Sequence, residues 1–250
     1  MTSPEEHDTG GSRPAFYALA PGGIGDWWTL LHPPYTLWHL SYVAIGAATA
    51  PELDIRWLLE TLLAFFLAMG VAAHALDELH GRPLGTRLPD IALILAAVFG
   101  LAGAVALGVD AAVHVSPWLA AFIVAGIFLV VAYNMELFGG AFHSDRWFAL
   151  AWGGFPAMTA AFAQTATVRG PAIMAAAACV VLSAAQRSLS TPVRHVRRHV
   201  ASVEGALVLR DGTREQLDAG ILRAAPESAL RLLSVALPLL AGAFVYARLA

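Results

Sequence analysis

The sequence has few of the charged residues that keep a protein soluble in water. Charged residues make up 13% of its 250 residues, whereas a soluble domain has about a quarter. Apolar residues make up 58% of the chain, which excludes extensive disorder as well as a water-facing globule. The formal net charge of −3 gives no support for nucleic-acid binding.

Several chemical signatures are also missing. Cys179 is the only cysteine, so no intramolecular disulfide can form. No Gly-x-Ser-x-Gly, Walker, His-Glu-x-x-His or Cys-x-x-Cys pattern occurs, which removes the usual hydrolase, ATPase, zincin and thiol-redox interpretations. Lysine is absent, so arginine must supply all the positive charge that orients the chain in a membrane.

Long apolar runs dominate what is present. A transmembrane helix needs about 20 mostly apolar residues, and the mean hydropathy of the chain is +0.65. Frequent Ala and Gly, as in residues 100–104, allow helices to approach closely. The sequence therefore predicts an all-α, polytopic transmembrane helix bundle of about seven spans. These are residues 33–50, 55–76, 90–109, 117–138, 147–167, 170–186 and 228–247.

The arginines set the expected orientation and domain organisation. Most of them follow even-numbered spans, so the positive-inside rule places the N-terminus in the cytoplasm. We expect an integral protein of a bacterial inner (plasma) membrane. Its expected parts are a disordered N-terminal tail (1–24), a six-span core (25–190), a cytoplasmic polar loop (191–227) and a C-terminal transmembrane helix (228–250).

Two short segments outside the spans have local signatures. Residues 26–31, with the sequence DWWTLL, predict a short interfacial helix anchored by its tryptophans. Within the polar loop, a short apolar run that begins at Ala206 ends at Asp211-Gly212, which is a hairpin signal. The arginine-rich segment around His195 and His199 is expected to meet anionic headgroups.

Ionisable side chains gather at the expected cytoplasmic end of the second span. His74 shares one helical face with Asp77 and Glu78, at positions i+3 and i+4, and His80 follows. An ionisable residue within a span costs about 2.5–3.5 kcal/mol near mid-bilayer, so such residues mark a site by default. Three of them on one face repel one another or share a cation or a proton.

The fourth and first spans contribute polar groups at the same side. The fourth ends with Tyr133, Asn134 and Glu136, and the first contributes His39. We expect the three spans to converge on one polar cavity. Carboxylates at a helix end suit Mg²⁺, whereas imidazoles mixed with carboxylates suit iron, manganese or zinc. The alternative is that these are interfacial residues solvated by water and headgroups. The candidate metal ligands are His74, Asp77, Glu78, His80, Glu136 and His143.

The arrangement resembles the UbiA superfamily of intramembrane prenyltransferases. Arg82-Pro83-Leu84 is similar to the ending of that family's first polar motif, and Tyr133 to the tyrosine that closes its fourth span. Residues 31–37 (LHPPYTL) resemble its first span. The similarity covers residues 25–200. The family's first aspartate motif is shortened here to His74, Asp77, Glu78 and His80, and residues 184–190 (AAQRSLS) stand in place of its second aspartate motif.

This resemblance implies a transferase that acts on a prenyl or other lipophilic substrate with a divalent metal, Mg²⁺ first, at the cytoplasmic face. Asp77 and Glu78 would hold the metal, which would stabilise a departing diphosphate. The implied partner is a membrane lipid or an isoprenoid, and no protein partner is indicated. The implied catalytic residues are Asp77, Glu78 and Tyr133, and the implied substrate-binding residues are His39, Arg82, Asn134 and Arg187.

Two other functions fit the same residues. The first is a transition-metal enzyme, with iron, manganese or zinc, that oxidises, desaturates or hydrolyses a lipid-like substrate. The second is a non-catalytic membrane bundle. Metal analysis of the purified protein separates the first from a magnesium-dependent transferase.

Overall fold

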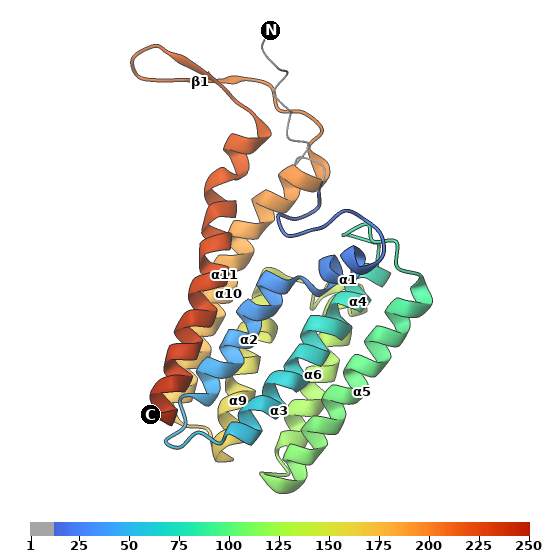
Figure 1. Ribbon diagram of the computed structural model, residues 1–250, viewed down its shortest axis with the longest axis vertical. Helices are drawn as coiled ribbons and strands as arrows, with labels where there is room; N and C mark the ends of the chain where they lie inside the picture. Colours follow the sequence, from blue (N-terminus) through green and yellow to red (C-terminus); the bar gives the residue numbers. More distant parts are fainter. Residues whose placement is uncertain (1–12) are drawn as a thin grey trace.

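The computed structural model describes residues 13–250 as a bundle of helices that lie side by side, with one small hairpin (Figure 1). Two of the helices contain π-helical segments, η1 and η2. In chain order the elements are α1 (Ile24–Leu31), α2 (Pro33–Ala47), α3 (Ile55–Phe65), η1 (Phe66–Ala73), α4 (His74–Leu79), α5 (Asp90–His114), α6 (Leu119–Asn134), α7 (Leu137–Gly140), α8 (Asp145–Phe148), η2 (Ala149–Gly154), α9 (Phe155–Thr165), α10 (Gly170–His199), β1 (Ala206–Val208), β2 (Arg214–Gln216) and α11 (Ala219–Leu249).

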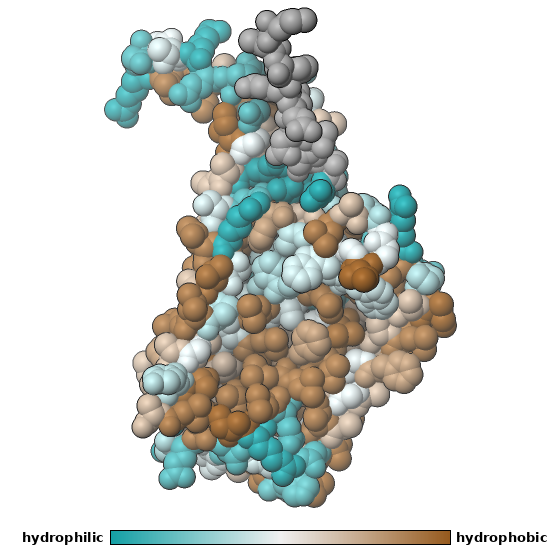
Figure 2. Space-filling view, in the orientation of Figure 1, coloured by the Kyte–Doolittle hydropathy of each residue, from teal (hydrophilic) through white to brown (hydrophobic). Residues whose placement is uncertain are grey.

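Four helices of the described chain are long and apolar enough to cross a membrane. They are the continuous helix Ile55–Leu79 (α3, η1 and α4), α5, α10 and α11. Figure 2 shows apolar side chains over the middle of the visible face and hydrophilic side chains at its two ends. The expectation of a helical membrane protein is thus confirmed at this level.

The other three expected spans are shorter or more polar than the sequence predicted. Helix α2 has 15 residues and α6 has 16, so at about 1.5 Å per residue neither reaches 30 Å, the thickness of the hydrocarbon core. The third is the continuous helix of α8, η2 and α9, whose Gly153, Gly154 and Pro156 lower its apolar content. Only four of the seven expected spans therefore meet the criteria of length and composition within residues 13–250.

The polar loop is shorter than the expected 191–227. Helix α10 continues to His199 and α11 already begins at Ala219. The two extensions pack together around an ion pair between Arg197 and Glu227, with an N–O distance of 2.7 Å and side chains that are 6% and 9% exposed. In the remaining loop the expected hairpin is confirmed, because β1 and β2 pair in antiparallel register.

The N-terminal segment, residues 13–23, differs from the disordered tail that we expected. Ala15, Tyr17 and Ala18 are buried, and the ring of Tyr17 packs against Tyr35, with ring centroids 5.4 Å apart. Burial of these apolar and aromatic groups holds the segment against the bundle. The rest of the predicted tail, residues 1–12, lies outside the described residues. The expected short helix is present as α1, which leaves the side chains of Trp27 and Trp28 exposed, and its place at a membrane interface stays a prediction.

Small residues bring the main chains of the helices into contact. A Cβ atom built on Gly46 of α2 would lie 2.0 Å from the carbonyl oxygen of Ala157 in α9. On Gly153 of η2 it would lie 2.5 Å from the carbonyl oxygen of Cys179 in α10. The expected close packing at Gly100 is also confirmed, since a Cβ there would lie 2.7 Å from a carbonyl of η1. These contacts draw α2, η2, α9 and α10 together.

Candidate anion-binding site

Both π-helical segments present a carbonyl group to a histidine of the expected site. His74 Nδ1 lies 3.1 Å from Gly70 O in η1, and His39 Nδ1 lies 2.9 Å from Trp152 O in η2. A carbonyl only accepts hydrogen bonds, so Nδ1 carries the proton in each ring and Nε2 is left as an acceptor. Such π-helical segments occur frequently at functional sites, and here they fix the tautomers of two buried imidazoles.

Ring stacking joins residues from separate helices at this end of the bundle. The ring of His32, in the turn before α2, stacks on His74 at 4.1 Å, and His143 stacks on Tyr133 at 4.5 Å. Burial, to which the neighbouring His74 adds, lowers the pKa of His32 well below 6.5, so its imidazole is neutral. Asp77 interacts electrostatically with His143. The ends of the first, second and fourth expected spans do therefore meet.

A second small group forms at the edge of this region. Glu136 lies between two histidines, with 4.0 Å to His80 Nε2 and 3.8 Å to His143 Nδ1. The same Nδ1 of His143 already lies 2.9 Å from Tyr133 O. About half of the side chain of Glu136 is exposed, so this group is a loose, solvated arrangement.

Glu78, an expected metal ligand, has both carboxylate oxygens engaged in hydrogen bonds within the protein. It is fully buried, and its carboxylate accepts hydrogen bonds from Leu84 N (3.0 Å), Thr86 N (2.8 Å) and Thr86 Oγ1 (2.9 Å). These bonds hold the turn that follows α4. Within residues 13–250, no group of three or more His, Cys, Asp or Glu side chains is arranged to hold a metal ion. The described side chains therefore give no support for the divalent metal that the resemblance implies, and that metal stays a prediction.

Two of the expected substrate-binding residues are also engaged locally. Arg82 donates to Leu88 O at 2.6 Å and pairs with Asp90. Asn134 donates from Nδ2 to Val130 O, one turn back in its own helix, at 2.7 Å. Their side chains stabilise the loop after α4 and the end of α6, and this geometry gives no support for substrate contact.

Three arginines lie on one face of α10. Arg187, Arg194 and Arg198 have the spacing i, i+7 and i+11, which places them within about 20° of one helical direction. We call these three residues the arginine cluster. Arg187 is held by Asp145, with an Nε–Oδ1 distance of 2.6 Å, and its guanidinium lies 5.3 Å from the centre of the Phe148 ring.

The other two arginines of the cluster lack such a partner. No described carboxylate lies within ion-pair distance of Arg194 or Arg198. Arg194 is partly buried, and its one side-chain hydrogen bond is a long one of 3.4 Å to Thr191 Oγ1. Partly buried guanidinium groups without counter-ions are costly, so a bound anion would stabilise this arrangement.

Several buried polar atoms on α10, on Tyr133 and on His32 have no hydrogen-bond partner. Arg194 interacts electrostatically with Tyr35 and Tyr133, and Asp77 does so with Arg194 and Arg198. Leaving a buried donor or acceptor unpaired costs about 1–3 kcal/mol. Five buried side-chain atoms in this region have no hydrogen-bond partner: His32 Nε2, Tyr133 Oη, Ser183 Oγ, Gln186 Oε1 and Arg198 Nε.

The N-terminal segment covers the same region. Tyr17 interacts electrostatically with Arg194, Arg198 and Asp77, and burial raises its pKa well above 10. Its backbone carbonyl accepts a hydrogen bond of 3.2 Å from the indole of Trp28 in α1. The sequence did not single out Tyr17, and it singled out Arg194 and Arg198 only as part of the segment expected to meet anionic headgroups, not as site residues. The i, i+7, i+11 spacing was the signal that could have identified the arginines.

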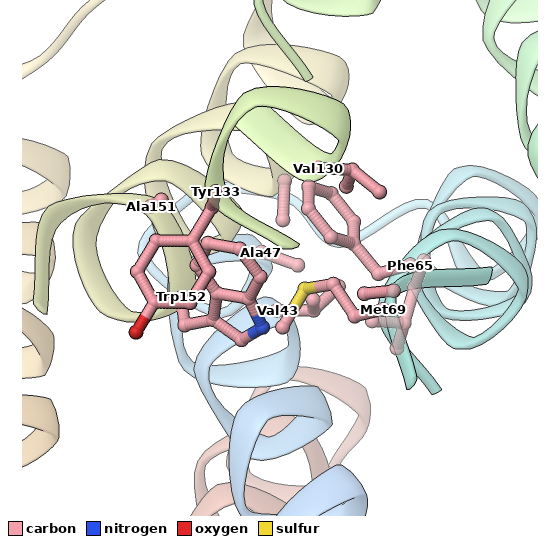
Figure 3. Close-up of a cluster of buried hydrophobic side chains, with 11 residues drawn as sticks. Val43, Ala47, Phe65, Met69, Val130, Tyr133, Ala151 and Trp152 are labelled. Atoms are coloured by element: carbon pink, nitrogen blue, oxygen red, sulfur yellow. The ribbon is translucent and has the colours of Figure 1, made fainter. Parts of the chain in front are cut away.

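An aromatic layer separates the arginine cluster from the apolar interior. The ring of Tyr133 lies 4.5 Å from that of Trp152, which stacks on Phe148 at 5.7 Å. Figure 3 shows Tyr133 and Trp152 beside Phe65 and Met69, with the hydroxyl of Tyr133 pointing away from the apolar cluster. The polar site therefore lies at the end of the bundle and is closed off from its core.

Comparison with known proteins adds no relative. No family model, no curated protein and no solved structure matches this chain. The functional argument therefore depends on the geometry of the site itself.

Proposed function

We propose that this chain is an integral membrane protein that acts on a lipophilic substrate with a phosphate or diphosphate headgroup, as a transferase of the UbiA type. The arginine cluster carries the proposal, because Arg194 and Arg198, at the end of membrane-crossing helices, have no carboxylate within ion-pair distance among residues 13–250. A headgroup of opposite charge supplies that partner while its apolar chain stays in hydrocarbon. Binding at the cytoplasmic face, with seven helices crossing or entering the membrane, belongs to the same proposal.

The chemistry follows from the groups around the cluster. Arg194 and Arg198 bind phosphate oxygens through charge-assisted hydrogen bonds, which are about twice as strong as neutral ones. Tyr17 and Tyr133 contribute hydroxyl donors. In the transfer, the allylic C–O bond of a prenyl diphosphate breaks and its electron pair leaves with the diphosphate, while a nucleophilic acceptor forms a bond to the allylic carbon and releases a proton to solvent. The prearranged donors then stabilise the charge that develops on the leaving group.

The proposal includes no step through a metal ion, because the described donors do not form a metal site. The expectation of Mg²⁺, or of iron, manganese or zinc, stays a prediction. Elemental analysis of the purified protein, together with the magnesium dependence of turnover, tests it directly.

Ligand binding to the purified full-length protein tests the headgroup site. We expect farnesyl diphosphate to bind more tightly than farnesol, which has the same chain and no phosphate. Replacing Arg194 with Gln should weaken binding of the diphosphate by about tenfold or more, as for the loss of a hydrogen bond to a charged group. Arg210→Gln, on the exposed hairpin, is the matched control and should bind normally.

Two outcomes would contradict the proposal at different levels. Equal binding of farnesyl diphosphate and farnesol would show that the site does not recognise an anionic headgroup. Tight binding of the diphosphate without its consumption, across a series of acceptors and chain lengths, would support the binding site but contradict the transferase activity.

A further inference from the structure

A second possible site lies in an apolar cavity away from the arginine cluster. The cavity has a volume of about 110 Å³ and lies between the helix Ile55–Leu79, α5, α6 and the helix formed by η2 and α9. Its walls include Phe65, Met69 and Trp152, which Figure 3 shows together. None of the residues of the arginine cluster lines it, so the inference drawn from it does not depend on the proposed function.

One residue in the wall of this cavity has a carboxylate oxygen without a hydrogen-bond partner. Glu60 accepts a hydrogen bond from Arg56 Nε through Oε1, at 2.7 Å, but its Oε2 is buried and unpaired. The hydroxyls of Thr61 and Thr159 also face this cavity, and both donate to carbonyls of their own helices, at 2.6 and 2.8 Å. Among the described wall residues, Glu60 therefore supplies the unsatisfied acceptor.

The charges around Glu60 restrict the ligand further. Arg56 pairs with Glu60 at 2.7 Å and with Asp110 at 2.6 Å, so the two carboxylates share one guanidinium. The unpaired Oε2 needs a hydrogen-bond donor, and a neutral hydroxyl supplies one between apolar walls without the cost of burying a further charge.

The dimensions of the cavity suit an elongated molecule. Glu60 and Met69 line the same cavity from one helix, and nine residues of helix span about 13 Å. The polar end lies near the start of α3, at the end of the bundle opposite the arginine cluster (Figure 1). The rest of the wall extends past Phe65 toward Trp152 and offers apolar contact and ring faces, apart from the hydroxyls of Thr61 and Thr159, which are bonded within their own helices.

We propose that this cavity binds a lipophilic phenol or alcohol whose hydroxyl donates to Glu60 Oε2 and whose apolar body extends toward Trp152. An ionised carboxylate only accepts hydrogen bonds, so its ligand must carry a donor. The apolar walls favour a ligand whose remaining part is hydrocarbon. The cavity is thus a binding site for a second membrane-soluble molecule, distinct from the headgroup site.

Photolabelling with a matched pair of probes tests this inference. The full-length protein in phosphatidylcholine nanodiscs is irradiated with a 4-alkylphenol that carries a diazirine on its chain, and in parallel with the alkylbenzene that lacks the hydroxyl. Peptide mass spectrometry then locates the label. We expect the phenol to label wall residues of the helix Ile55–Leu79 and α6 about tenfold more than the alkylbenzene does. One hydrogen bond made to a charged group raises the affinity by about this factor.

Three variants make the test specific. Glu60→Met should abolish the preference for the phenol. Asp110→Asn removes the other partner of Arg56 without touching the cavity, and it should keep the preference. Ala64→Phe fills the cavity while keeping Glu60, and it should lose labelling by both probes. Equal labelling by both probes in the unmodified protein would indicate an acyl-chain site and overturn the proposal, as would an unchanged preference in Glu60→Met.

Discussion

The imidazoles of His32 and His74 lie one on the other, with ring centroids 4.1 Å apart and planes inclined by 26°. The pair connects the turn before α2 with the start of α4, and it lies beneath Tyr17 of the N-terminal segment, whose ring is 5.3 Å from that of His32. Two stacked imidazoles repel each other once both are protonated. The pair therefore makes this end of the bundle sensitive to acid.

The first prediction concerns stability at low pH. Burial lowers the pKa of His32 well below 6.5, and His74, Arg194 and Arg198 act in the same direction. The folded protein thus binds fewer protons than the unfolded chain below pH 6.5, so stability falls as the pH drops below that value. The loss is about 1.4 kcal/mol for each unit by which the pKa is lowered.

Thermal unfolding in detergent between pH 8 and pH 5 measures this effect. His32→Asn removes the titrating ring and suits the positive φ of 47° at this position, so its unfolding temperature should fall less steeply below pH 6.5. His195→Asn, on an exposed part of α10, is the control. The same slope in His32→Asn as in the unmodified protein would rule out His32 as the origin.

The second prediction separates a structural role of Glu78 from a metal-binding role. In Glu78→Gln, one acceptor oxygen becomes an NH₂ group that faces the donors of Leu84 and Thr86. We expect a loss of about 1–3 kcal/mol in the free energy of unfolding, together with faster proteolysis at residues 80–87. Glu204→Gln, on the exposed loop, should change neither. A variant of normal stability that loses a bound metal ion would favour the ligand role instead.

The third prediction uses Asp77 to test for a metal in the headgroup site. Asp77 interacts with both Arg194 and Arg198, so removing its charge should strengthen the binding of farnesyl diphosphate without metal. We expect Asp77→Asn to bind the diphosphate a few times more tightly than the unmodified protein in the presence of a chelator. If Asp77 holds Mg²⁺ for the substrate, the variant will instead bind more weakly and lose its magnesium dependence. Glu52→Gln, which is exposed, controls for the change in overall charge.

The fourth prediction concerns the extension of α10 and α11 beyond the apolar region. Glu227 accepts from Arg197 at 2.7 and 2.9 Å and from Arg231 at 2.7 Å. Glu227→Leu alone should destabilise the protein by about 3 kcal/mol, because it leaves buried positive charge without its carboxylate. The double variant Arg197→Met, Glu227→Leu should recover most of that loss. Thermal unfolding of the two single variants and the double variant gives the coupling, and a purely additive result would show that the pair contributes little.

Much of the fold could be predicted from local patterns in the sequence. The apolar helix α5, the short helix α1 and the hairpin at Asp211-Gly212 each depend on neighbouring residues, and each is present. The end of α10 could not be predicted in this way. Hydropathy falls at Arg187, which ends an apolar run but does not end a helix, so Arg194 and Arg198 were assigned to a loop.

The site was harder to predict than the fold, because its contacts join residues that come together only when the chain has folded. The sequence placed His74, Asp77 and His143 in one region, and Asp77 does interact electrostatically with His143, while their role in a site stays a prediction. It gave no indication that Glu78 accepts from the turn that follows it, because those donors approach only after the chain has folded back. A carboxylate with satisfied oxygens and one without them have the same sequence pattern, and only the tertiary contacts distinguish them.

The contact between Gly46 and Ala157 leaves no room for a side chain between α2 and α9. A Cβ atom at position 46 would lie 2.0 Å from the carbonyl oxygen of Ala157, so the two helices approach each other main chain to main chain. Any larger residue at position 46 would therefore push α2 away from α9. That displacement would also shift the imidazole of His39 on α2 relative to the carbonyl of Trp152, to which it is hydrogen-bonded.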